Sequence, residues 1–201
     1  MYIVENLKRR IGQVTGRVPS ARQAGNRVVR RRPRTFLFRD DGSIPNNPAL
    51  PFVIYPAALR LDGAEDPAAI FEGLFAANGW GSSWRNGIYD YVHYHSNIHE
   101  VLGIARGRAR VQFGGAKGEE IEIAAGDVAI LPAGTGHQCL MASTDFLVVG
   151  AYPPAGSYDE CRGSADEHRR AKQSIPKTPL PQKDPVYGAK GPLMGLWQPD
   201  E

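Results

Sequence analysis

The chain has 201 residues, of which 42% are hydrophobic and 22% are charged, and these proportions are ordinary for a globular protein. No apolar run approaches the roughly 20 residues that span a bilayer, so a membrane protein is excluded at this level. The N-terminus carries no signal-peptide pattern, and the two cysteines form no CxxC motif. We therefore expect a cytoplasmic protein without disulfides.

Positive charge is concentrated at the N-terminus, although the net charge of the chain is only +3. Residues 1–34 contain ten Lys or Arg against the single acidic residue Glu5. Such an arm can meet phosphate, but a basic run is more often a solvated segment. It lacks the interleaved aromatic residues of a nucleic-acid-binding module. We expect a basic arm over residues 1–34, with neither nucleic acid nor membrane as partner.

The elements before residue 80 are assigned to an N-terminal extension, residues 1–79, that packs on the following domain. Apolar residues at helical spacing predict a short helix over residues 3–14, and strands are predicted at 35–38 and 52–61. A stronger signal predicts a helix over about 66–78. It has Asp66 as N-cap and Pro67 at its first position, and Asn78-Gly79 follows as a stop signal.

Between residues 80 and 153 the pattern changes to short segments with a period of two, separated by glycine turns. So many short strands with almost no helix between them indicate an all-β sandwich or barrel. The seven segments cover residues 88–95, 100–105, 109–114, 120–124, 127–132, 137–142 and 145–152.

The last part of the chain, residues 154–201, is predicted to form a helix followed by an extended tail. Ser164 and Glu167 form a capping box at the start of the helix, and His168 within it is expected to be solvated. The proline-rich tail is expected to lie over the barrel or a neighbouring subunit.

Three of the five histidines lie within "DYVHYHSNIHE", residues 90–100. On a straight strand His93, His95 and His99 would share one face, because their separations are even. Glu100 can join His93 and His95 only if a turn at Ser96-Asn97 shifts the register by one.

The strand that follows distinguishes these two registers. If Glu100 points inward, so do the bulky Leu102 and Ile104, whereas an inward His99 would bring Val101, Gly103 and Ala105. Large apolar side chains belong in the core, so we favour the register in which Glu100 points inward.

"GDVAILPAGTGH", residues 126–137, brings one more imidazole, His137, to the start of a strand. His93, His95, Glu100 and His137 together would form a mixed nitrogen and oxygen ligand set. Such a set suits one divalent transition metal, Fe, Mn, Ni, Co or Zn, with coordination positions left for substrate. Taken singly, each of these residues would more often be structural, and it is their joint spacing that predicts a metal site.

The same residues carry a resemblance to a family. The first stretch resembles the first cupin motif, G(x)5HxH(x)4E(x)6G, and the second resembles G(x)5PxG(x)2H, the start of the second cupin motif. The asparagine that usually follows in the second motif is replaced by Met141. The matching residues are Gly87, His93, His95, Glu100, Gly107, Gly126, Pro132, Gly134 and His137.

From about residue 35 to the C-terminus the chain is similar to the YjlB-like bacterial cupins. The stretches that carry this narrower likeness are "DDGSIPNNPALP", "NGWGSSWRNGIYDY", "HYHSNIHEVLG" and "DPVYGAKGPLMGLW". The resemblance implies a double-stranded β-helix, the cupin (RmlC-like) jelly-roll barrel, over residues 80–153 with a few flanking helices, and frequently a homodimer. It implies no particular substrate, because the fold hosts many activities.

Two functions follow as hypotheses. The first is a metal-dependent enzyme acting on a small polar organic molecule, with dioxygenase chemistry slightly favoured over isomerase or lyase chemistry. Tyr91 would be its proton donor. The second is a non-catalytic module that binds or senses a small ligand. Arg85 and Gln112 are further candidates as polar anchors in the pocket, and Cys139, with the parity of His137, is expected mainly to fill space.

Overall fold

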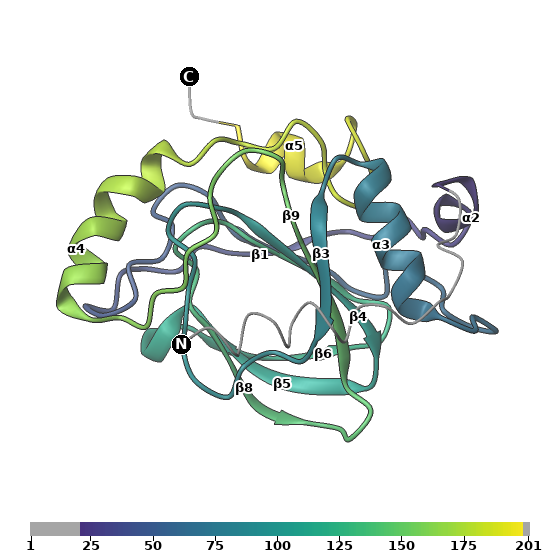
Figure 1. Cartoon of the computed structure of the whole chain (residues 1–201), viewed down its shortest axis with the longest axis horizontal. Helices are drawn as coiled ribbons and strands as arrows, with labels where there is room; N and C mark the ends of the chain where they lie inside the picture. The colour runs from purple at the N-terminus through teal and green to yellow at the C-terminus, as the bar shows by residue number, and fades with distance from the viewer. Residues whose placement is uncertain (1–20, 199–201) are drawn as a thin grey trace.

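The computed structural model describes residues 21–198, and the helix predicted at residues 3–14 lies outside this range (Figure 1). The strands are β1 (Arg34–Phe36), β2 (Phe52–Tyr55), β3 (Gly81–Asn86), β4 (Glu100–Arg106), β5 (Arg108–Phe113), β6 (Glu119–Ala124), β7 (Val128–Leu131), β8 (His137–Ala142) and β9 (Leu147–Tyr152). The α-helices are α2 (Ala21–Gly25), α3 (Pro67–Ala77), α4 (Ala165–Ser174) and α5 (Pro192–Leu196).

The strands form two sheets, in which all the strand pairs are antiparallel. The larger sheet has the order β1-β2-β7-β4-β9-β3, and the smaller has the order β6-β5-β8. The predicted fold class, an all-β jelly roll with a few flanking helices, is confirmed. Strands β1 and β2 belong to the larger sheet, although residues 1–79 were expected to pack outside the barrel. The sheet therefore includes residues that precede residue 80.

The two faces of the larger sheet pack against different parts of the chain, because side chains alternate along each strand. On the inner face, Leu102 and Ile104 of β4 pack with Val111 and Phe113 of the smaller sheet. On the outer face, Val101 belongs to a second cluster, formed with α3 and the C-terminal residues.

Helix α3 covers the outer face, and the structure confirms the helix predicted at 66–78. The Asp66 side chain accepts hydrogen bonds from the amides of Ala68 and Ala69, and Pro67, at the first helical position, has no N–H that needs a partner. Phe71 lies directly over Gly103 of β4, where a Cβ atom would come within 2.3 Å of its ring. The glycine therefore allows the close packing of helix and sheet.

Two predictions about strands were wrong, and both concern the segment before β4. Residues 81–86 form β3, which the sequence analysis missed because this largely exposed edge strand lacks apolar alternation. Residues 88–95 form no continuous strand and make only isolated bridges at His93 and Tyr94. The backbone bends at residues 90–91 and 96–97, on either side of the two bridges, in which His93 pairs with β8 and Tyr94 with residue 161.

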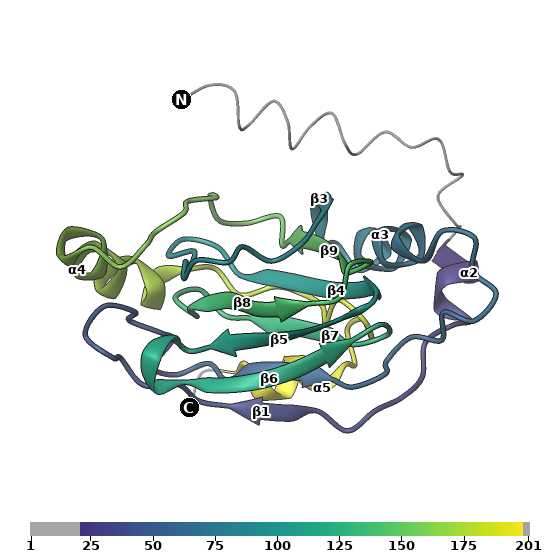
Figure 2. The same ribbon diagram turned by 90° about the horizontal axis from the view of Figure 1, so that it is seen from below.

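The C-terminal region runs along the outside of the sheets. The capping box predicted for Ser164 and Glu167 is present at the start of α4, which lies at the opposite end of the molecule from α3 (Figure 2). The tail returns to the larger sheet, where the Trp197 indole donates a hydrogen bond to the Pro51 carbonyl (2.8 Å). Among the described residues, no helix has the length and apolar character needed to cross a membrane.

Candidate metal centre

Backbone pairing brings two of the histidines together. His93 and His137 form an antiparallel bridge, in which each amide donates to the other residue's carbonyl at 3.2 and 2.9 Å. Their rings are consequently 4.0 Å apart between centroids. His95 follows two residues later, and its ring centroid is 5.7 Å from that of His93. All three side chains are buried, with exposures of 6% or less.

One nitrogen from each of the three rings lies within 4.8 Å of the other two. The opposite nitrogen of each ring, Nδ1, contacts a main-chain carbonyl, on Tyr91 for His93 (3.3 Å) and on Thr135 for His137 (3.2 Å). His95 Nδ1 contacts the carbonyl of Asp159. A carbonyl can only accept, so each Nδ1 carries a proton, and in a neutral ring Nε2 then presents a lone pair.

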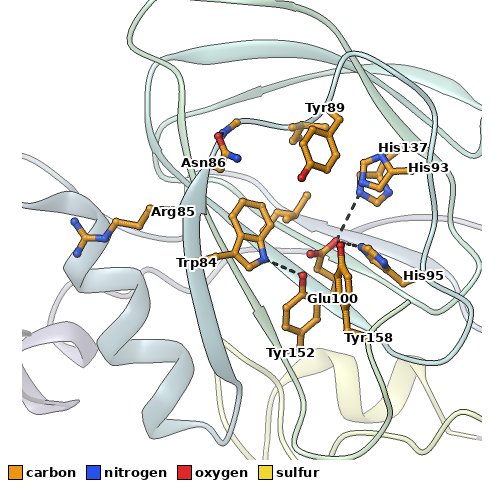
Figure 3. A pocket seen from close by; sticks show the side chains of 13 residues that line it. Trp84, Arg85, Asn86, Tyr89, His93, His95, Glu100, His137, Tyr152 and Tyr158 are labelled. Carbon is orange, nitrogen blue, oxygen red and sulfur yellow. Dashed lines mark hydrogen bonds and ion pairs between the residues drawn. The ribbon is translucent and has the colours of Figure 1, made fainter. Parts of the chain in front are cut away.

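Glu100 supplies a carboxylate at the same place, and its exposure is only 2%. Its Oε2 lies 3.3 Å from Nε2 of His95 and 3.6 Å from Nε2 of His137 (Figure 3). This oxygen is fully buried and makes no hydrogen bond of ordinary geometry with the described residues. An unpaired buried carboxylate oxygen is costly, and a cation at this place would satisfy it.

The pKa shifts describe the same cluster. Burial lowers the pKa of His93 and of His137, so these rings are neutral. Burial acts in the same direction on His95, but the negative charge of the Glu100 carboxylate outweighs it and raises its pKa. Burial alone would raise the pKa of Glu100, yet His95 in particular brings it down to about 2.

His95 provides a test of whether a metal fits the site. Both of its nitrogens face acceptors, namely the Asp159 carbonyl at Nδ1 and the Glu100 carboxylate at Nε2. The ring must therefore be a charged imidazolium, or Nε2 must share a cation with the carboxylate. Three imidazole nitrogens and one carboxylate oxygen are ligands that first-row divalent metals accept. The residues fit a metal ion.

His99 lies on the other face of β4, as the favoured register predicts. Its Nδ1 accepts a hydrogen bond from the amide of Ala133 (3.0 Å), and its ring packs on Trp197. The Pro179 carbonyl interacts with the ring, although not in good hydrogen-bond geometry. The register with Glu100 inward is confirmed, because Leu102 lies in the core between the sheets and Val101 on the opposite face.

A cavity opens beside the cluster, and its wall is largely aromatic (Figure 3). The space in and above it, including that at its open mouth, is about 460 Å³. The residues that line it are Trp84, Arg85, Asn86, Gly87, Ile88, Tyr89, His93, His95, Glu100, Leu102, His137, Tyr152 and Tyr158.

Tyr91, the expected proton donor, is not among the residues that line this cavity. Its ring stacks on Tyr89, its hydroxyl donates to Glu160 (3.3 Å), and the Arg162 guanidinium lies 4.0 Å from its ring centre. Tyr89, which shares its parity, lines the cavity instead. The Tyr91 ring does lie beside the cluster, with its centroid 5.6 Å from that of His93, but its hydroxyl is directed to Glu160.

The other two candidate polar anchors, Arg85 and Gln112, bind to protein groups outside the cavity. The Arg85 guanidinium points away from the cavity, toward α3, where it forms ion pairs with Asp66 and Glu72 at 2.9 and 2.7 Å (Figure 3). Gln112 donates to the carbonyl of Gly115, so neither candidate supplies the cavity with a polar head group.

Three further expectations concern residues outside the ligand set. Cys139 packs against the inner core, as expected of a space-filling thiol. Met141, the departure from the cupin motif, is 64% exposed and is not one of the cavity-lining residues, so this departure does not reach the site. The expectation for His168 was wrong, because its side chain is only 17% exposed and pairs with Asp40 at 2.8 Å.

Three aromatic residues of the cavity were missed by the sequence analysis. Tyr152 could have been predicted to face inward, because it lies an even number of residues from Val148, a core residue on the same strand β9. Trp84 was missed together with its strand, β3. Tyr158 comes from the loop after β9, where no periodicity exists, and its ring centroid lies 4.9 Å from that of His95.

Several solved structures show a distant likeness to the chain. Acireductone dioxygenase from Bacillus anthracis, with a cadmium ion in its active centre, is 19% identical with a TM-score of 0.31, over 42% of this chain and 58% of that chain. Oxalate decarboxylase from Bacillus subtilis is 19% identical with a TM-score of 0.34, over 57% of this chain and 28% of that chain. At these TM-scores the likeness carries no argument about chemistry.

No protein-family model matches the chain. A much stronger similarity is to the uncharacterized protein YjlB of Bacillus subtilis (strain 168), with 41% identity over 169 residues. The match covers 84% of this chain and 99% of YjlB, so the two proteins correspond over nearly the whole length of the relative. The chain belongs to the YjlB family.

Proposed function

We propose that this protein is a metal-binding cupin and that it acts as a metal-dependent enzyme on a small polar organic molecule. His93, His95, Glu100 and His137 would hold one divalent ion, either Fe, Mn, Ni, Co or Zn. The observation that carries the proposal is the buried Oε2 of Glu100, which lies 3.3 and 3.6 Å from two imidazole nitrogens and makes no hydrogen bond of ordinary geometry within residues 21–198.

A metal at this place would supply Lewis acidity to a carbonyl or carboxylate oxygen of the substrate. The chain's own residues support that chemistry in two ways. The main-chain carbonyls fix which nitrogen of each histidine faces the site. The aromatic wall offers apolar surface to a substrate, while phenol groups and Asn86 offer polar atoms.

The direct test is metal analysis of protein purified without added metal, followed by thermal unfolding with Fe(II), Mn(II), Ni(II), Co(II) or Zn(II) in turn. Metal near one ion per chain, with a higher Tm on reconstitution, is the expected result. A ligand at 100 times its Kd stabilises the folded state by about 2.7 kcal/mol. The proposal fails if the protein is metal-free as purified and none of these ions raises its Tm.

Screening small metabolites against the metal-loaded protein then addresses the substrate. A compound that raises the Tm further and is converted identifies an enzyme, and oxygen uptake by the iron-loaded form distinguishes a dioxygenase from an isomerase or lyase. Binding without conversion would instead identify the non-catalytic alternative. Tyr91→Phe is a matched control, because Tyr91 lies outside the cavity and its loss should leave metal content unchanged.

A further inference from the structure

Trp84 and Tyr152 are neighbours on the cavity wall, on the paired strands β3 and β9. Trp84 pairs with Gly150, so Tyr152 is its diagonal neighbour, two residues further along β9. A Cβ atom at position 150 would lie 2.0, 2.1 and 2.4 Å from three atoms of the indole. Glycine at this position therefore lets the indole cross β9 and reach Tyr152.

The hydrogen bond between the two side chains has a defined direction. Trp84 Nε1 lies 2.9 Å from the Tyr152 hydroxyl oxygen (Figure 3). An indole N–H can only donate, so the tyrosine oxygen accepts this bond. The single hydroxyl proton of Tyr152 must then be donated in a different direction. Trp84 thereby determines where Tyr152 can donate.

The group in that direction is Glu100. Strands β4 and β9 are paired with Val101 opposite Ala151, and the next position of this antiparallel register places Glu100 opposite Tyr152. Side chains of directly opposed residues have Cβ atoms about 4.5–5.5 Å apart, within reach of a tyrosine hydroxyl. The hydroxyl of Tyr152 is also one of the groups that act on the Glu100 carboxyl.

We propose that Trp84 and Tyr152 are positioning residues for the Glu100 carboxylate. Trp84 holds the Tyr152 hydroxyl, which donates to Oε1 of Glu100. Oε2, the oxygen without a hydrogen bond, then stays turned toward His95 and His137. The inference rests on the proposed function, because Oε2 is the oxygen that would bind the metal.

The carboxylate needs such support more than the imidazoles do. Each histidine is held at Nδ1 by a main-chain carbonyl, but a glutamate has a longer side chain with more rotatable bonds and no such anchor. Groups that orient a metal ligand from outside the coordination sphere typically contribute 10- to 100-fold in metal affinity. We expect Tyr152 to contribute within this range, and Trp84 to contribute less because it acts through Tyr152.

The test measures Co(II) affinity of the full chain by competition with a chelator, together with the visible spectrum of bound Co(II). Tyr152→Phe removes only the hydroxyl and should weaken Co(II) binding about 10- to 100-fold and change the intensity of the Co(II) bands. Trp84→Phe should cause a smaller loss of the same sign. Tyr158→Phe, another phenol of the cavity wall, is the matched control and should change affinity less than about 2-fold.

A double-mutant cycle shows whether Tyr152 acts through Glu100. In a Glu100→Ala background, Tyr152→Phe should have no further effect on Co(II) affinity. A loss that persists in this background, or a Tyr152→Phe variant with wild-type affinity and spectrum, overturns the inference alone. A wild-type protein that binds no Co(II) overturns the proposed function as well. If Tyr152→Phe does not fold, Trp84→Phe carries the same test.

Discussion

His99 and Glu100 are consecutive residues with opposite surroundings. Both side chains are buried, with exposures of 0% and 2%. The His99 ring accepts a hydrogen bond from Ala133 and packs on Trp197, and the Pro179 carbonyl interacts with it, although its Nε2 makes no hydrogen bond of good geometry with the described residues. Glu100 faces imidazole nitrogens and keeps one oxygen without a hydrogen bond. The His99 imidazole therefore contacts only protein groups among the described residues, whereas the Glu100 carboxylate and the histidines around it are groups that could hold a cation.

The largest effect is expected when a proposed metal ligand next to Glu100 is removed. His137→Ala should lower metal affinity by more than about 100-fold, beyond the cost of losing an outer hydrogen-bond partner. The reason is that the site would keep two imidazoles and one carboxylate, which hold a metal less tightly. Chelator competition measures the effect, with Tyr91→Phe as control. Equal affinities of the His137→Ala variant and the wild type would show that His137 is not a ligand.

On the opposite face, His99→Ala should cost stability and not metal. It leaves the buried Ala133 amide without its acceptor and opens a cavity beside Trp197, for a combined loss of about 2–4 kcal/mol. Urea unfolding of the metal-free protein measures this loss, and metal content should stay near one ion per chain. Metal loss with unchanged stability would mean that the two faces had been assigned the wrong way round.

A substitution at Gly103 tests whether the packing of helix α3 on the outer face is independent of the metal site. Gly103→Ala would place a methyl group 2.3 Å from the Phe71 ring and force the ring to move. The expected cost is about 1–3 kcal/mol, as for other overpacked positions. Thermal unfolding of the metal-free variant should show the loss, while its metal affinity should match that of the wild type. A change in affinity would show that packing of α3 is transmitted through β4 to the site.

The smallest effect is expected far from both faces, at Asp40. Burial acts to raise the pKa of this carboxyl, but hydrogen bonds from His168, the Gly42 amide and Lys172 lower it from 3.8 to about 2. A pKa depressed by folding contributes stability that is fully present above about pH 4 and is lost as the pH falls toward 2.

Urea unfolding of the wild type and of Asp40→Asn at several pH values tests this expectation. The wild type should be the more stable of the two at pH 5, and its advantage should shrink between about pH 4 and pH 2. The contribution should be small, because the pair is partly exposed and therefore screened. A difference that is constant over this range would show that the carboxylate charge of Asp40 contributes nothing.

The sequence predicted those parts of the site that depend on local periodicity. The alternation of Leu102 and Ile104 was enough to choose the face of Glu100, because a slip of one residue would have put these side chains in the wrong layer. The helix at 66–78 was predictable from its own cap residues for a similar reason. In both cases the decisive interactions lie within a few residues of one another.

What the sequence did not predict depends on residues far apart in the chain. Trp84 could not be placed, because β3 is a strand only through its pairing with β9, more than 60 residues later. Arg85 was a plausible anchor for an anion until Asp66 and Glu72 proved to be its partners. Tyr91 has the same parity as His93 and its ring does lie beside that of His93, but its hydroxyl donates to Glu160, a partner 69 residues later in the chain.

The main-chain carbonyls at the three Nδ1 atoms have a consequence for how this site can change during evolution. A carbonyl is present whatever amino acid occupies its position, so a substitution at Tyr91, Thr135 or Asp159 does not by itself remove the accepting oxygen. The carboxylate has no such protection, because we propose that its orientation depends on the side chains of Trp84 and Tyr152. Relatives that drift in sequence should therefore keep their three imidazoles in the same orientation, and differences in metal preference among them should arise at the carboxylate.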